Sequence, residues 1–182
     1  SLTLLAACEN AEYTPLTNKA FILQTNTNAN SSEKITIGTS SVSSSVNVRL
    51  SSPAAENYTF EVVADTAALA EYNQRNETSY KALPSNLYSL SANEVTVEAG
   101  KAISSEVKLT INPLTQALKD SGQKYAVALR LKSKDGKYDI LSAGSTRVYL
   151  LDQVVYQAVP VINATHNIHF GMRQTYDLTQ WT

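Results

Sequence analysis

The stretch YNQRNETSYKALPSNLYSLSANEVTVEAGKAISSEVKLTI, residues 72–111, holds the most regular strand pattern of the chain. Polar and apolar residues alternate over residues 94–98, so that Val95 and Val97 share one face of a strand. After a break that contains a glycine, the alternation resumes over residues 107–111. Two half-buried strands joined by a short connection predict an antiparallel pair with one face toward solvent.

The same alternation extends in both directions from this stretch. It predicts further strands at residues 20–23, 35–37, 46–50, 58–62, 88–90, 125–131 and 148–150. An Asp-Gly pair at residues 135–136 suits the turn of a hairpin. Two short helices are expected, one at residues 65–73, where Asp65 or Thr66 can cap the first turn, and one at residues 114–120. The sequence therefore predicts a mainly all-β fold, an immunoglobulin-like antiparallel β-sandwich with two short helical connections.

The composition is that of one ordinary domain with a real core and a weakly charged surface. Of the 182 residues, 43% are hydrophobic and 17% are charged, and the net charge is −1. Nucleic-acid binding requires a concentrated basic footprint, and this balanced composition gives no reason to expect such a partner. The single cysteine excludes a disulfide within the chain and cannot form a structural zinc site alone. No cofactor is indicated.

The first residues have the character of a secretion signal. Residues 1–8 (SLTLLAAC) are apolar but too short to span a bilayer, which takes about 20 residues. They end in Leu-Ala-Ala-Cys, which resembles the bacterial lipobox, so Cys8 is predicted to be lipidated and to anchor the protein to a membrane. The alternative is a buried free cysteine on an N-terminal strand. The polar residues 9–18 are then a tether, and residues 19–155 form the sandwich domain.

Several short strings of the chain resemble one known family. The order of YN, SY, LPSNLYSLS and EVTVEAG, followed by a strand, a short helix and KYAVALRLKS, is similar to domain of unknown function 1735. This domain occurs near the N-terminus of Bacteroidetes surface lipoproteins. Some relatives carry it ahead of a family 18 endo-β-N-acetylglucosaminidase, and others ahead of a lectin-like or discoidin-like module. The resemblance covers residues 19–155. It implies an outer-membrane, cell-surface location, and the family defines no catalytic residues.

Residues 156–182 differ in character from the sandwich. They are predicted to be a linker followed by the start of a lectin-like module, because residues 177–182 (DLTQWT) resemble the opening of such a jelly roll. The alternative is a C-terminal strand that packs on the sandwich. The first interpretation makes the chain the N-terminal part of a longer protein.

No catalytic constellation can be assembled from the sequence. On a strand, His166 and His169 would face opposite sides, which is a poor arrangement for binding one metal ion. Glu94 and Glu98 would share one strand face, and glycosidases use two carboxylates about 5 to 10 Å apart. Glutamates on a strand face without surrounding aromatic residues are nevertheless usually solvated. We therefore expect that this chain is not an enzyme.

Ten tyrosines suggest a surface for sugar stacking. Aromatic rings pack on the apolar faces of sugars, and tyrosine adds a polar hydroxyl group. Tyr72, Tyr80 and Tyr88 are the candidate glycan contacts, because they lie in loop-rich sequence. The alternative is that these tyrosines pack at the edges of the sheets.

Three functions are compatible with these observations. The favoured one is a non-catalytic domain of a lipid-anchored surface protein, which presents a downstream module for glycan capture or utilisation. Its expected partners are the outer membrane, a glycan and outer-membrane glycan-uptake proteins. The second is direct carbohydrate binding. The third is the N-terminal part of a glycoside hydrolase whose catalytic domain lies beyond residue 182.

Overall fold

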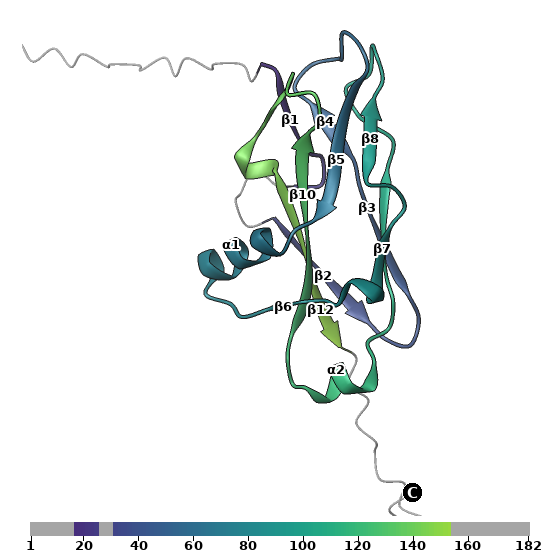
Figure 1. Ribbon diagram of the computed structural model, residues 1–182, viewed down its shortest axis with the longest axis vertical. Helices are drawn as coiled ribbons and strands as arrows, with labels where there is room; N and C mark the ends of the chain where they lie inside the picture. The colour runs from purple at the N-terminus through teal and green to yellow at the C-terminus, as the bar shows by residue number, and fades with distance from the viewer. Residues whose placement is uncertain (1–16, 26–30, 154–182) are drawn as a thin grey trace, which may run out of the picture.

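The computed structural model describes residues 17–25 and 31–153 (Figure 1). The predictions made for Cys8, for His166 and His169, and for the lectin-like opening at residues 177–182 lie outside these residues. No helix among the described residues is long and apolar enough to cross a membrane.

The described residues form two layers of strands. The first layer is a sheet in the order β2-β12-β10-β5-β8, in which a short strand, β6, also pairs with β10. Its members are β2 (Ser32–Ile37), β12 (Thr146–Gln153), β10 (Tyr125–Ser133), β5 (Tyr58–Ala64), β8 (Glu94–Val97) and β6 (Lys81–Ala82). The central strand β10 pairs antiparallel with both β12 and β5.

The second layer consists of two small sheets, and consecutive strands of the chain, β3 and β4, belong one to each sheet. One has the order β3-β9-β7 and the other β11-β1-β4. Their members are β3 (Val42–Val46), β9 (Val107–Ile111), β7 (Tyr88–Leu90), β11 (Asp139–Ile140), β1 (Lys19–Ile22) and β4 (Val48–Leu50). Asn47 alone separates β3 from β4, so the chain passes from one small sheet directly into the other.

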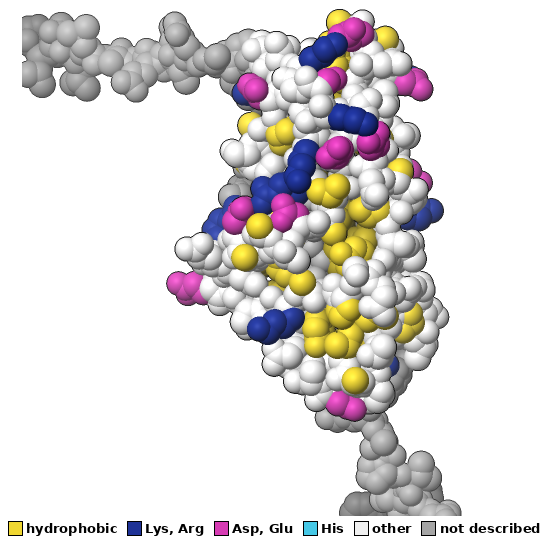
Figure 2. All heavy atoms as spheres, viewed as in Figure 1, with side chains coloured by type: hydrophobic (Ala, Val, Ile, Leu, Met, Phe, Trp, Pro, Cys, Tyr) yellow, Lys and Arg dark blue, Asp and Glu magenta, His cyan; other side chains and the backbone are white. Residues whose placement is uncertain are grey.

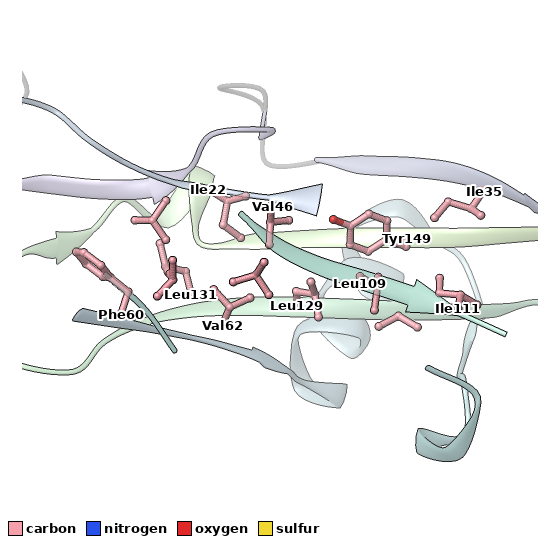
Figure 3. Packing of buried hydrophobic residues seen from close by; sticks show 14 of the residues in the cluster. Ile22, Ile35, Val46, Phe60, Val62, Leu109, Ile111, Leu129, Leu131 and Tyr149 are labelled. Atoms are coloured by element: carbon pink, nitrogen blue, oxygen red, sulfur yellow. The ribbon is translucent and has the colours of Figure 1, made fainter. Parts of the chain in front are cut away.

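The core lies between the two layers. It is filled by the apolar residues of the strands, which alternate with polar residues along the sequence. Figure 3 shows apolar side chains from both layers pointing toward one another, among them Phe60, Leu109 and Leu129. Val95 and Val97 are buried while Glu94 is exposed, as the alternation predicts. The mainly all-β sandwich with two α-helical connections is therefore confirmed.

The predicted pairing of the two strands in the quoted stretch is wrong. Strand β8 pairs with β5 in the first layer, whereas β9 lies between β3 and β7 in the second. Both strands bury their valines in one core, but they approach it from opposite sides. Their connection does turn at Gly100, where Lys101 N–H donates to the Glu98 carbonyl at 3.0 Å, but the chain beyond this turn bonds to β4, with Leu50 N–H donating to the Ala102 carbonyl at 2.8 Å.

The Asp-Gly pair at residues 135–136 also does not form the predicted hairpin. The strand that comes after it, β11, pairs in parallel with β1 rather than folding back on β10. Two further pairings are parallel, β2 with β12 and β6 with β10, so the sandwich is not purely antiparallel. Alternation along one strand carries no information about the direction of its neighbour, which explains why the sequence did not indicate these pairings.

Helix α1 (Thr66–Asn76) covers the outer face of the first layer beside β10 and β12 (Figure 1). Its buried residues Ala68, Leu69 and Tyr72 pack in a second apolar cluster with Ala126, Ala128, Val148 and Leu150. The remaining helical elements are α2 (Gln116–Asp120) and the 3₁₀ turns η1 (Ser85–Leu87) and η2 (Ser142–Gly144). Because α1 covers its outer face, β10 is buried on both faces from Tyr125 to Leu129.

The described chain enters and leaves the domain at opposite ends of its long axis. Figure 1 shows β1 beginning at one end, whereas β12 ends at the other, beside α2. Strand β12 alone has eight residues, which corresponds to roughly 26 Å at ~3.3 Å per residue. The packed strands therefore hold the two points of entry and exit far apart.

Replacing Ala128 by leucine is expected to destabilise the protein by about 1–3 kcal/mol, because Ala128 is buried where α1 packs on β10 and a larger side chain would disturb this contact. Lys132→Leu is the matched control, since Lys132 lies on the same strand but is exposed, and it should change stability by no more than about 0.5 kcal/mol. Urea denaturation measures both. Equal effects would contradict the tight contact between α1 and β10.

Candidate functional site

The three candidate tyrosines do not form one surface. Tyr72 is only 7% exposed on the underside of α1, and its hydroxyl donates to Ser32 Oγ at 3.3 Å. Tyr80 packs against the same apolar cluster, and burial raises the pKa of its hydroxyl, with Asp152 adding to the effect. Tyr88 belongs to β7 and packs on the main core instead. Glycan contact by these residues stays a prediction, but Tyr72 offers no open ring face for stacking.

The two glutamates of the quoted stretch are exposed and paired with lysines. Glu94 contacts Lys134 at 2.6 Å, and Glu98 contacts Lys101 at 2.5 Å. The hydrogen bond from Lys101 lowers the pKa of Glu98, whereas a general acid needs a raised pKa. Each of the two carboxylates is thus held in an exposed ion pair with a lysine. Among residues 17–25 and 31–153, no three His, Cys, Asp or Glu side chains come together as a metal site.

The best-defined polar arrangement lies where α1 meets β10. Asp65 caps α1, and its Oδ1 accepts hydrogen bonds from the backbone N–H groups of Ala67 at 2.8 Å and Ala68 at 3.3 Å. Its other oxygen accepts from Arg130 Nε at 2.5 Å. Arg130 Nη2 also donates to Glu71 Oε1 at 2.9 Å. One guanidinium thus joins the first turn of the helix to the middle of the sheet.

This network sets the charge state of Asp65. Burial alone would raise the pKa of this carboxyl, but the hydrogen bonds from Arg130, Ala68 and Ala67 outweigh burial and lower the pKa below its ordinary value of 3.8. Asp65 is therefore ionised near neutral pH. The sequence indicated Asp65 as one of two candidate caps. It gave no sign of Arg130 or Glu71 as partners, although Arg130 comes after Ala126 and Ala128 on the outward face of β10.

A groove opens beside this network, between α1 and η2. It has a volume of about 540 Å³ and is lined by Glu71, Gln74, Arg75, Arg130, Ser142 and Ser145. Figure 2 shows acidic and basic side chains gathered over this side of the molecule. The η2 wall is held in place at Gly144, where an added Cβ would lie 2.6 Å from the Cβ of Phe21. Only glycine lets η2 approach β1 so closely.

A second polar cluster lies at the side of the sandwich and links several strands to one another. Arg147 Nη1 donates to the Gln24 carbonyl at 2.7 Å, and Nη2 donates to Glu33 Oε2 at 2.8 Å. The same glutamate oxygen accepts from Ser44 Oγ at 3.2 Å. Arg147 thus ties Gln24, just after β1, to β2 and β12.

Comparison with known proteins assigns the chain to a family. A family model that describes an N-terminal domain matches residues 11–137. The chain belongs to this family. The match confirms the resemblance that the sequence indicated. None of the curated proteins compared with the chain matches it.

Solved structures from Bacteroides species share the fold. A Bacteroides ovatus protein provisionally described as carbohydrate-binding has 16% identity and a TM-score of 0.57, over 75% of this chain and 37% of that one. A two-domain protein of unknown function from Bacteroides fragilis has 16% identity and a TM-score of 0.59, over 77% and 47%. EndoBT-3987 of Bacteroides thetaiotamicron, solved with its Man5GlcNAc product, has 19% identity and a TM-score of 0.54, over 67% and 28%.

At identities of 16% to 19%, the likeness concerns the fold and not a shared activity. The chain spans less than half the length of each of these structures. The fold is therefore one that occurs as a part of larger bacterial proteins, one of which is an endoglycosidase by name.

Replacing Asp65 by alanine removes both the cap of α1 and a charged partner of Arg130, and is expected to cost about 1–3 kcal/mol at pH 7. Asp65→Asn keeps a capping oxygen and should cost less. Because folding lowers the pKa of Asp65, its ionised form stabilises the fold above pH 3.8, and this stabilisation is lost as the pH falls through the lower pKa of the folded state.

Denaturation of the wild type and Asp65→Asn between pH 7 and pH 2 measures this dependence. The difference in unfolding free energy between the two proteins should shrink below pH 3.8. A difference that stays constant over the whole range would mean that the charge of Asp65 does not stabilise the fold.

Proposed function

We propose that this chain is a non-catalytic presentation domain of a lipid-anchored surface protein of a Bacteroidetes outer membrane. It holds a downstream module, engaged in glycan capture or utilisation, away from the membrane. Any reaction of a longer parent protein, such as glycoside hydrolysis, would then belong to a module beyond Thr182.

The observation that carries this proposal is the position of the two ends of the sandwich. Strand β1 begins at one end of the long axis and β12 ends at the other (Figure 1). A domain whose chain entered and left at the same end would add little distance between its neighbours. In this arrangement the neighbouring parts of the protein are separated by the length of the packed strands. A packed sandwich keeps that distance fixed, whereas a flexible linker does not.

The chemistry of the described residues supports a non-catalytic role. Glu94 and Glu98 each form an exposed ion pair with a lysine, and no three His, Cys, Asp or Glu side chains come together among the described residues. The fold also recurs as less than half of several larger Bacteroides proteins, which include EndoBT-3987 and a provisional carbohydrate-binding protein. A glycan-related parent protein is the common context of these two relatives.

Cys8 supplies the membrane attachment in this proposal. Its Leu-Ala-Ala-Cys sequence resembles a lipobox, and residues 9–18 provide a polar tether before the sandwich. Lipid on Cys8 would place the entering end of the sandwich toward the membrane and the leaving end away from it. Outer-membrane glycan-uptake proteins would then be the neighbours of the presented module.

The spacer role is tested by exchanging residues 19–155 in the parent protein for a Gly/Ser linker of the same number of residues. A flexible linker of this length has a root-mean-square span of roughly 60–70 Å that fluctuates continuously, so the downstream module is no longer held at a fixed distance and orientation and should capture less glycan on intact cells. The control exchanges the same residues for an unrelated β-sandwich whose ends also lie at opposite poles, which should restore capture. Unchanged capture with the linker would refute the spacer role.

Replacing Cys8 by serine in the parent protein should move the protein from the membrane fraction to the soluble fraction, because the thiol is the proposed site of lipidation. Fractionation and intact-mass analysis measure the location and the loss of the lipid. A wild-type protein that carries an unmodified Cys8 would contradict the proposed anchor, whatever the outcome of the linker exchange.

A further inference from the structure

The groove between α1 and η2 has the size of a binding site, and its lining is polar. Its volume of about 540 Å³ lies within the ~300–1,000 Å³ that is common for small-molecule sites. Its walls are charged, amide or hydroxyl-bearing side chains from α1, β10 and η2 and from Ser145, which directly follows η2. Both walls are supported by packing, because α1 packs on the sheet and Gly144 allows η2 to lie close against Phe21 of β1.

The donors and acceptors of the groove are prearranged. Arg130 is fixed by Asp65 and Glu71, and these two bonds use two of the five N–H groups of a guanidinium. Its other N–H groups have no hydrogen-bond partner in the described part of the chain, and the side chain lines the groove. Glu71 adds acceptor oxygens, and Gln74 provides both a donor and an acceptor.

The balance of charge around the groove selects the class of ligand. Asp65 and Glu71 carry two negative charges, and Arg75 and Arg130 carry two positive charges. An anionic ligand would compete with carboxylates that already hold Arg130. A neutral ligand rich in hydroxyl groups meets no such competition, because each hydroxyl both donates and accepts. Adjacent hydroxyls also match the paired N–H groups of a guanidinium and the two oxygens of a carboxylate.

We propose that this groove binds a neutral oligosaccharide, with Glu71, Gln74 and Arg130 as the residues that contact its hydroxyl groups. The inference goes beyond the spacer role and does not depend on it, since the groove lies on the side of the sandwich and not at its ends. It differs from the tyrosine hypothesis, because none of Tyr72, Tyr80 and Tyr88 lines this groove.

Nuclear magnetic resonance titration of the 182-residue chain tests the proposal. The probes are three neutral oligosaccharides, Man5GlcNAc, maltohexaose and xylohexaose, and the anionic comparator is an oligogalacturonate. At least one neutral probe should shift the amide signals of Gln74, Ser142 and Ser145. No shift with any neutral probe, shifts centred on Tyr80 or Tyr88 instead, or tighter binding of the oligogalacturonate would each overturn the proposal.

Variants then separate binding from folding. Gln74 is exposed, so Gln74→Ala should leave the fold intact and weaken binding of the neutral probe roughly tenfold, as expected for a lost hydrogen bond. Glu71→Gln keeps the shape but loses the charge that orients Arg130, and should weaken binding similarly. Gln123→Ala, at an exposed glutamine outside the groove, is the matched control and should bind like the wild type. Equal affinity of Gln74→Ala and Gln123→Ala would overturn the proposed site.

These variants leave the length and the ends of the sandwich unchanged. A failure of glycan binding therefore does not affect the spacer role, and a failure of the linker exchange does not affect the groove.

Discussion

The contact between α1 and the outer face of β10 is the constraint on which the rest of the structure depends. Strand β10 is the centre of the first layer, where it pairs with β12 and β5. A helix can cover such a strand closely only if the outward side chains are small, and Ala126 and Ala128 meet this condition. The inward residues Val127 and Leu129 at the same time fill the core between the layers. One strand therefore joins both apolar clusters.

The same strand creates the polar site where the helix stops covering it. The next outward residue after Ala128 is Arg130, which is only partly buried and reaches the cap of α1 through Asp65. The positive charge of Arg130 is tolerated at this position because two carboxylates compensate it. These are Asp65 at the start of the helix and Glu71 about a turn and a half later. The groove therefore lies where α1 begins and where β10 is no longer covered by this helix.

Much of the fold can be predicted from local pattern, whereas its pairings cannot. Alternation placed β5, β8, β9, β10 and β12 correctly, because each strand buries one face in a single core. It could not assign β8 and β9 to different layers, since both layers present the same alternation to that core. Asp65 could be named from its neighbours alone as one of two candidate caps. Its hydrogen bond with Arg130 joins residues 65 positions apart in the sequence, and a local sequence pattern cannot indicate a contact over such a separation.

The geometry keeps the two proposed roles compatible. Separation requires the ends of the sandwich, where β1 begins and β12 ends, and glycan binding would use the side where α1 lies (Figure 1). If α1 capped an end of the sandwich, a ligand beside it would compete with the adjoining parts of the protein. Because the helix instead lies across the middle of the first layer, a bound oligosaccharide would stay accessible while both ends remain occupied. The position of α1 on the sheet therefore determines whether a spacer domain could also bind an oligosaccharide.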